Sequence, residues 1–191
     1  MSLPLINPSA QPTHYTGVAM VLHWLMALAI LGLFGFGIYM TDLPFSPTRL
    51  KFYNWHKWAG ISILLLSVLR LIWRITHRPP PLPAAISKAM PGWQLGAYHA
   101  THHLMYLLFF AVPLLGWTYS SAAGFAVVWF GHIALPDLVS VDKALADLIK
   151  PLHKLSALAL VGLAVLHLAA VLKHLWIDRD SLLQRMLPGH H

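Results

Sequence analysis

The histidines of the last apolar stretch have the clearest chemical meaning in this sequence. His153 and His167 are fourteen residues apart within one apolar run. In an α-helix, fourteen residues leave two side chains about 40° apart around the axis, on nearly one face. The same interval rises about 21 Å, which is most of the thickness of the hydrocarbon layer of a membrane. A helix here therefore presents two metal-ligating imidazoles at two depths.

Two further histidines match those depths. His56 begins an apolar run that starts on the same side as His153, and His23 lies in a run that starts on the opposite side, near the depth of His167. The depths pair His56 with His153 and His23 with His167. An iron held by two axial imidazoles suits electron transfer, because no position is left for oxygen. We therefore predict two b-type haems, with these four histidines as the iron ligands.

Other uses of the histidines are weaker alternatives. A histidine inside a membrane can hydrogen-bond across helices without holding a cofactor. A tetrahedral zinc site needs three or four close ligands, and no thiol or carboxylate is near these positions. The sequence has no cysteine, which excludes iron–sulfur clusters, thiolate ligation of haem and covalent haem attachment through a cysteine pair.

Four apolar segments position these histidines. Each is close to the length that crosses a bilayer, and backbone groups in lipid must be hydrogen-bonded internally, so each is predicted as a helix. The stretch 120–151 is predicted to hold an interfacial or re-entrant segment followed by a short amphipathic helix. We expect an all-α integral membrane protein, a single membrane domain over 1–191, in which a four-helix transmembrane bundle encloses two haems. The predicted helices are 18–40, 53–75, 98–119 and 152–176.

The composition agrees with a membrane protein. The 191 residues are 58% hydrophobic and only 10% charged, whereas soluble domains are about 25% charged. The chain is basic, with 13 Lys and Arg against 6 Asp and Glu. These charges stand at the ends of apolar runs rather than on a soluble surface, so a nucleic-acid partner is not expected and a lipid bilayer is.

Charge also bears on orientation. Four spans place both termini on one side, here named side A, together with the loop between the second and third helices; the opposite side is side B. The cluster of Arg70, Arg74 and Arg78 ends the second helix on side A. Positive residues are enriched on the cytoplasmic side, so both termini are predicted to be cytoplasmic.

Several more side chains are candidates for supporting roles. Arg70 and Arg74 could pair with haem propionates, or only anchor their helix at the interface. His174 continues the stripe of His167 towards side A, where it could bind a quinone carbonyl, move protons or be a surface histidine. A group of three histidines heads the third helix and could cap it, contact propionates or serve as substitute ligands: His99, His102 and His103.

Short motifs spread along the chain carry a family resemblance. They are Leu22-His23-Trp24, Trp55-His56-Lys57, Arg70-Leu71-Ile72-Trp73-Arg74, Pro113-Leu114-Leu115-Gly116-Trp117 and Asp178-Arg179-Asp180. In this order and spacing the chain resembles the bacterial cytochrome b561 family over nearly all its length. That family is similar to the cytochrome b subunits of membrane hydrogenases and formate dehydrogenases.

The resemblance implies a bacterial inner-membrane protein with two haems b, ligated by the four histidines already paired, and a ubiquinone site. One branch looks like superoxide oxidase, which passes electrons from periplasmic superoxide to ubiquinone. Positive charge on side B would attract such a small anion, although no catalytic residue is assigned. The candidates for this attraction are Lys57, Lys150 and Lys154.

Two other functions stay open on the sequence. One is a cytochrome b conduit or anchor subunit that links a redox protein, docked on the 120–151 loop, to the quinone pool. The other is a haem-free transporter or scaffold with polar histidines.

Overall fold

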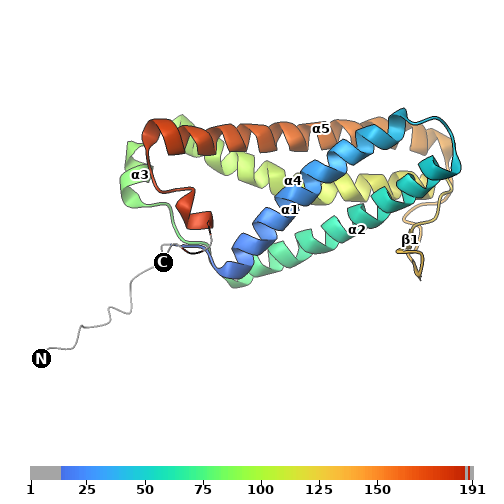
Figure 1. Ribbon diagram of the computed structural model, residues 1–191, viewed down its shortest axis with the longest axis horizontal. Helices are drawn as coiled ribbons and strands as arrows, with labels where there is room; N and C mark the ends of the chain where they lie inside the picture. Colours follow the sequence, from blue (N-terminus) through green and yellow to red (C-terminus); the bar gives the residue numbers. More distant parts are fainter. Residues whose placement is uncertain (1–13, 188, 190–191) are drawn as a thin grey trace, which may run out of the picture.

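The computed structural model describes residues 14–187 and 189. Four long helices run along the longest axis of the molecule (Figure 1). Each is long and apolar enough to cross a membrane, which confirms the expectation of four candidate membrane-spanning helices. α1 begins and α5 ends at the same end of the bundle, side A, as four spans require (Figure 1). The helices are α1 (Gly17–Asp42), α2 (Pro47–Thr76), α4 (Gly92–Ala122) and α5 (Lys143–Lys173).

All four helices are longer than their predicted apolar runs, and in α2 and α5 a capped polar first turn supplies the extra length. The Ser46 side chain accepts a hydrogen bond from the Arg49 backbone N–H, and Pro47 occupies the first helical position, where its missing N–H costs nothing. Asp142 likewise caps α5 by accepting from the Leu145 N–H at 3.1 Å. The helix therefore continues through Pro151, and the separate amphipathic helix predicted before that proline is the first part of α5.

The side A end contains more structure than the sequence indicated. A short helix, α3 (Ala84–Ala89), follows the proline run. The predicted helix over 152–176 ends differently, because α5 passes into a wider π-helical turn, η1 (His174–Asp178). The chain then reverses and forms a 3₁₀ turn, η2 (Gln184–Met186).

Side-chain hydrogen bonds hold this C-terminal segment against the bundle. The indole N–H of Trp24 donates to the Met186 carbonyl at 2.8 Å. The buried guanidinium of Arg185 donates to the carbonyls of Pro80 and Pro81. These bonds fasten the end of the described chain to α1 and to the proline run.

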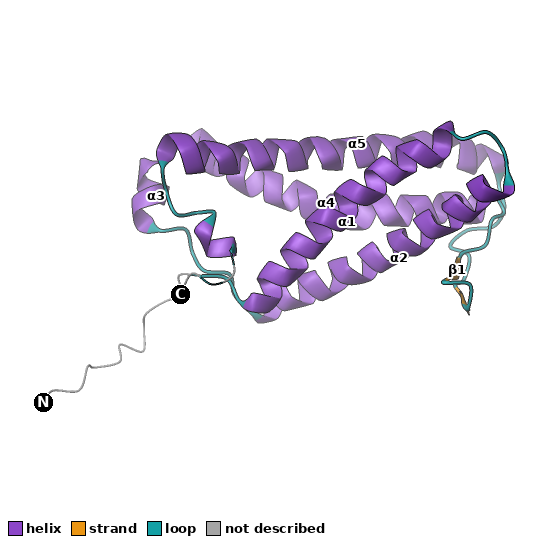
Figure 2. Ribbon diagram, viewed as in Figure 1, coloured by secondary structure: helices purple, strands orange, loops and turns teal. Residues whose placement is uncertain are grey.

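At side B, residues 128–134 of the stretch predicted to hold an interfacial or re-entrant segment form a β-hairpin (Figure 2). Its strands, β1 (Val128–Trp129) and β2 (Ile133–Ala134), pair antiparallel in a two-stranded sheet. The Trp58 indole of α2 donates to the Val128 carbonyl, and the Trp129 indole donates back to the Trp58 carbonyl. The hairpin is thereby fixed beside the first turns of α2.

The core is a thin apolar layer between the two ends. Met26 of α1, Phe109 of α4 and Leu160 of α5 are buried together. Pro113 has no N–H to bond the Phe109 carbonyl. The buried Ser67 hydroxyl of α2 donates to the Ile63 carbonyl at 2.8 Å and also approaches the Phe109 carbonyl at 3.4 Å. Many other large apolar side chains are exposed along the helices, as expected for surfaces that face lipid.

Candidate cofactor sites between paired histidines

The histidine pair nearer side B joins α2 and α5. The ring centroids of His56 and His153 are 6.2 Å apart, and the rings are almost perpendicular. Both side chains are partly buried within the bundle. The structure thus brings together the first predicted pair.

The second pair joins α1 and α5 nearer side A. The ring centroids of His23 and His167 are 6.4 Å apart, with an interplanar angle of 73°. Leu160, in the apolar core layer, is midway in sequence between His153 and His167, so this layer separates the two pairs. The pairing by depth is as predicted, while iron ligation by these residues stays a prediction.

The spacing of both pairs fits a shared metal ion. Two imidazoles that bind one ion from opposite sides have two bonds of about 2 Å each between them. Adding the distance from each ligating nitrogen to its ring centre gives a centroid separation of about 6 Å.

Glycines in the neighbouring helices make room for the side B pair. A Cβ placed on Gly37 of α1 would lie 3.1 Å from Cε1 of His56, and one on Gly116 of α4 would lie 3.0 Å from Cε1 of His153. Both distances are shorter than ordinary van der Waals contact. An added Cβ on Gly32, Gly35 or Gly60 of the same bundle would by contrast meet nothing within 4 Å.

Hydrogen bonding at the side B pair leaves a place for a further group. Nδ1 of His153 contacts the Val112 carbonyl at 2.9 Å; since a carbonyl only accepts, Nδ1 carries the proton and Nε2 is free to bind a metal. Within the described residues, Nδ1 of His56 and the indole nitrogen of Trp117 are buried with no hydrogen-bond partner. Buried polar atoms are normally satisfied, so these two fit a site that accepts a ligand with acceptor atoms.

Basic and aromatic side chains surround the side A pair. The Nη2 atom of Arg70 lies 3.0 Å from Nδ1 of His23, and its Nε atom donates to the Tyr106 hydroxyl at 3.3 Å. The guanidinium of Arg74 lies over the Tyr106 ring, 5.5 Å from its centroid. Both arginines line one pocket with Arg78. In the part of the chain that the structure describes, none of the three forms an ion pair with a carboxylate, so this pocket offers positive charge to an anionic group.

A third histidine joins the side A pair. The ring of His102 lies 5.1 Å from that of His167, and its Nδ1 donates to the Tyr98 carbonyl at 2.7 Å. His99 and His103, from the same sequence group, are exposed. The sequence showed that the three share one end of a helix, but it did not show which of them points into the bundle.

The three predicted anion-attracting lysines differ in environment. Lys57, directly after His56, is half-buried, and its ammonium donates to the Ala126 carbonyl at 3.0 Å. Lys150 and Lys154 are exposed on the first turns of α5. Of these three lysines, Lys57 is therefore the one that a hydrogen bond holds against the side B loop.

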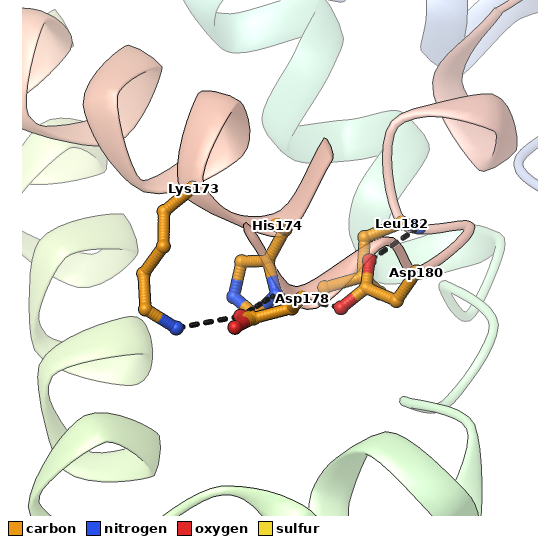
Figure 3. A network of polar contacts seen from close by, with 5 residues as sticks. All are labelled: Lys173, His174, Asp178, Asp180 and Leu182. Carbon is orange, nitrogen blue, oxygen red and sulfur yellow. Dashed lines mark hydrogen bonds and ion pairs between the residues drawn. The ribbon is translucent and has the colours of Figure 1, made fainter. Parts of the chain in front are cut away.

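His174, the quinone candidate, lies in a polar network that the sequence did not predict. Its Nδ1 lies 2.6 Å from Oδ2 of Asp180 and 3.0 Å from Oδ2 of Asp178 (Figure 3). Lys173 forms an ion pair with Asp178 at 2.5 Å. The carboxylates occupy Nδ1, so Nε2 is the nitrogen left for another contact.

Known proteins share these features of sequence. A family model described as prokaryotic cytochrome b561 matches residues 14–189. Cytochrome b561 homolog 2 of Escherichia coli (strain K12) is 35% identical over 92% of this chain and 92% of its own length. The probable superoxide oxidase CybB of Yersinia pestis is 29% identical over 91% of this chain and 96% of its own. Cytochrome b561 homolog 1 of Escherichia coli (strain K12) is 33% identical over 75% and 78%.

Proposed function

Since the chain belongs to the prokaryotic cytochrome b561 family of membrane electron-transfer proteins, we propose that it holds two haems b between its paired histidines and transfers electrons from superoxide to ubiquinone. The observation that carries this proposal is the presence of two histidine pairs at two depths, with ring centroids 6.2 and 6.4 Å apart.

The four histidines would hold the two irons, His56 with His153 and His23 with His167. Haem held by these imidazoles would supply one-electron reduction and oxidation at each site. The chain contributes the orientation of these imidazoles, through the Val112 carbonyl at His153 and through the glycines beside His56 and His153.

Positive side chains at each end of the helix bundle would bind or attract anions. Arg70 and Arg74 are the proposed partners of propionate carboxylates near side A, because both line a basic pocket and neither pairs with a carboxylate among the described residues. Lys57, Lys150 and Lys154 would attract superoxide to side B, the proposed periplasmic side.

The overall reaction balances without a further reactant. Two superoxide anions each lose one electron and become dioxygen, and ubiquinone takes up two electrons and two protons to become ubiquinol. His174 is the proposed quinone contact, since Nδ1 is engaged by carboxylates and Nε2 can meet a quinone carbonyl. The superoxide donor is suggested by the name of the Yersinia pestis relative and by the lysines of side B.

Haem quantitation on variants tests the ligands. We expect two haems per chain in the parent protein, from a reduced-minus-oxidised spectrum with pyridine haemochrome quantitation, and one in His56→Ala and in His167→Ala. The matched control is His103→Ala, because this exposed side chain lies on α4 outside both pairs. A parent without haem, or single-ligand variants with two, would contradict the assignment.

The electron donor and acceptor need a separate assay. Purified protein in liposomes with ubiquinone is mixed with a superoxide source, and ubiquinol formation is measured against protein-free liposomes. No ubiquinol beyond the control would refute the superoxide activity while leaving the haem assignment intact.

A second candidate function is an electron conduit for a redox protein. The hairpin favours it, because Val128, Phe130 and Ile133 expose apolar side chains at side B. A redox protein that co-purifies with the chain and reduces its haem, when superoxide does not, would favour this function.

A further inference from the structure

A cluster of metal-ligating side chains lies at the side A end of α5, apart from the paired histidines. His174, Asp178 and Asp180 each offer one ligand atom, and these atoms all lie within 4.8 Å of one another. In the searched part of the chain, residues 14–187 and 189, no other group of three such side chains has this spacing.

The backbone of the turn creates the cluster. Asp178 is four residues after His174, a spacing that puts two side chains on the same face of an α-helix. Asp180 is six residues after His174 and would point away if the helix continued. Instead Arg179 adopts φ 53°, a left-handed conformation that is unfavourable for a residue with a side chain, and the Asp180 N–H bonds back to the His174 carbonyl. This reversal brings the second carboxylate to the imidazole.

The single hydrogen that Nδ1 of His174 can carry cannot bond fully to both carboxylates. Oδ2 of Asp180 and Oδ2 of Asp178 both approach the same Nδ1 atom, at 2.6 and 3.0 Å (Figure 3). An imidazole nitrogen carries at most one hydrogen, so it cannot make two linear hydrogen bonds. The second carboxylate relies on Lys173, whose side chain is 43% exposed and can turn out into water.

We propose that His174, Asp178 and Asp180 form a binding site for a divalent transition-metal ion of the zinc class. A tetrahedral ion with bonds of about 2 Å separates its ligand atoms by roughly 3.3 Å. The distances from Nδ1 of His174, 3.0 Å to Asp178 and 2.6 Å to Asp180, would therefore lengthen by less than about 1 Å around an ion. The imidazole favours Zn²⁺ or Cu²⁺ over Mg²⁺ or Ca²⁺, which take oxygen ligands. The His174 and Asp180 side chains are 12% and 15% exposed, so the ligands are shielded, while the more open Asp178 side leaves room for water as a fourth ligand.

Zinc titration of the full-length, haem-loaded protein in detergent tests this site. The background carries His190→Ala and His191→Ala, because two terminal imidazoles could bind zinc themselves. Competition with a chromophoric chelator is expected to give one tight zinc ion per chain. Asp180→Asn is expected to weaken this affinity at least tenfold. Asp147→Asn is the matched control, because it removes a carboxylate of an exposed ion pair at the other end of α5.

Further measurements separate this site from surface histidines and from misfolding. Cu²⁺ bound by the parent protein is expected to show nitrogen coordination in its EPR spectrum. The His174→Gln variant is expected to lose this nitrogen signal. Excess Mg²⁺ is expected not to compete with Zn²⁺ for the site. If Asp180→Asn does not yield folded protein, judged by its elution profile, Asp178→Asn gives the same measurement. The proposal is overturned if the parent binds no tight zinc, or if folded Asp180→Asn and His174→Gln bind zinc as the parent does. Haem content is measured separately from the visible spectrum, so the zinc result does not depend on whether the haem assignment is correct.

Discussion

Gly116 offers the sharpest test of how the side B pair is built. Replacement by alanine adds a methyl carbon 3.0 Å from Cε1 and 3.3 Å from Nδ1 of His153. Carbon atoms pack best at about 3.5–4.0 Å, so the imidazole must move by half an ångström or more. Its Nδ1 is also held by the Val112 carbonyl at 2.9 Å, so movement strains that hydrogen bond.

The expected cost follows from overpacking a well-packed site. Such insertions cost about 1–3 kcal/mol. With a factor of ten for every 1.4 kcal/mol, the side B site of Gly116→Ala should hold its haem about 5- to 150-fold more weakly than that of the parent.

The assay uses His167→Ala as the background, so that only the side B haem is retained. Haem loss to an excess of an apoprotein acceptor is followed in the visible spectrum, with and without Gly116→Ala. Gly162→Ala is the matched control, because this glycine is exposed on α5, nine residues from His153 and so on the opposite face, with nothing within 4 Å of an added Cβ. If Gly116→Ala loses haem no faster than Gly162→Ala, the close approach of α4 does not position His153.

Three further predictions concern the core and side B. Ser67→Ala removes a buried hydroxyl that bonds the Ile63 carbonyl and approaches the Phe109 carbonyl, and we expect it to lower the free energy of unfolding in detergent by about 0.5–1.5 kcal/mol; an unchanged thermal midpoint would contradict this. Met26→Ala empties a fully buried position in the apolar layer and should cost about 2–5 kcal/mol in the same measurement. Lys57→Gln should slow haem reduction by superoxide severalfold and weaken its dependence on salt, whereas Lys143→Gln, paired with Asp147, should change it less; equal rates for the two variants would remove Lys57 from the role.

Much of this protein could be predicted from sequence alone, because the strongest signals are local. Apolar runs near membrane length predict four helices whatever surrounds them. The constant rise and rotation of a helix place His153 and His167 on one face at two depths. The alternation of spans then assigns His56 and His23 to matching depths, and the structure brings both pairs together.

Helix ends were predicted less well, because capping rather than hydropathy decides them. Ser46 and Asp142 start α2 and α5 in polar sequence, and Pro151 does not stop α5. A proline inside a helix removes one hydrogen bond, a loss that the packing of a long helix can tolerate.

Only the tertiary structure decided which side chains meet across helices. Periodicity specifies height and direction on one helix, but the distance to a neighbouring helix depends on how all of the side chains pack. The contacts of Gly37 and Gly116 with histidines, and of His102 with His167, arise in this way. The meeting of Asp180 with His174 depends on a left-handed residue at Arg179, a conformation that no local preference of arginine favours, so no reading of the sequence pattern could have placed it.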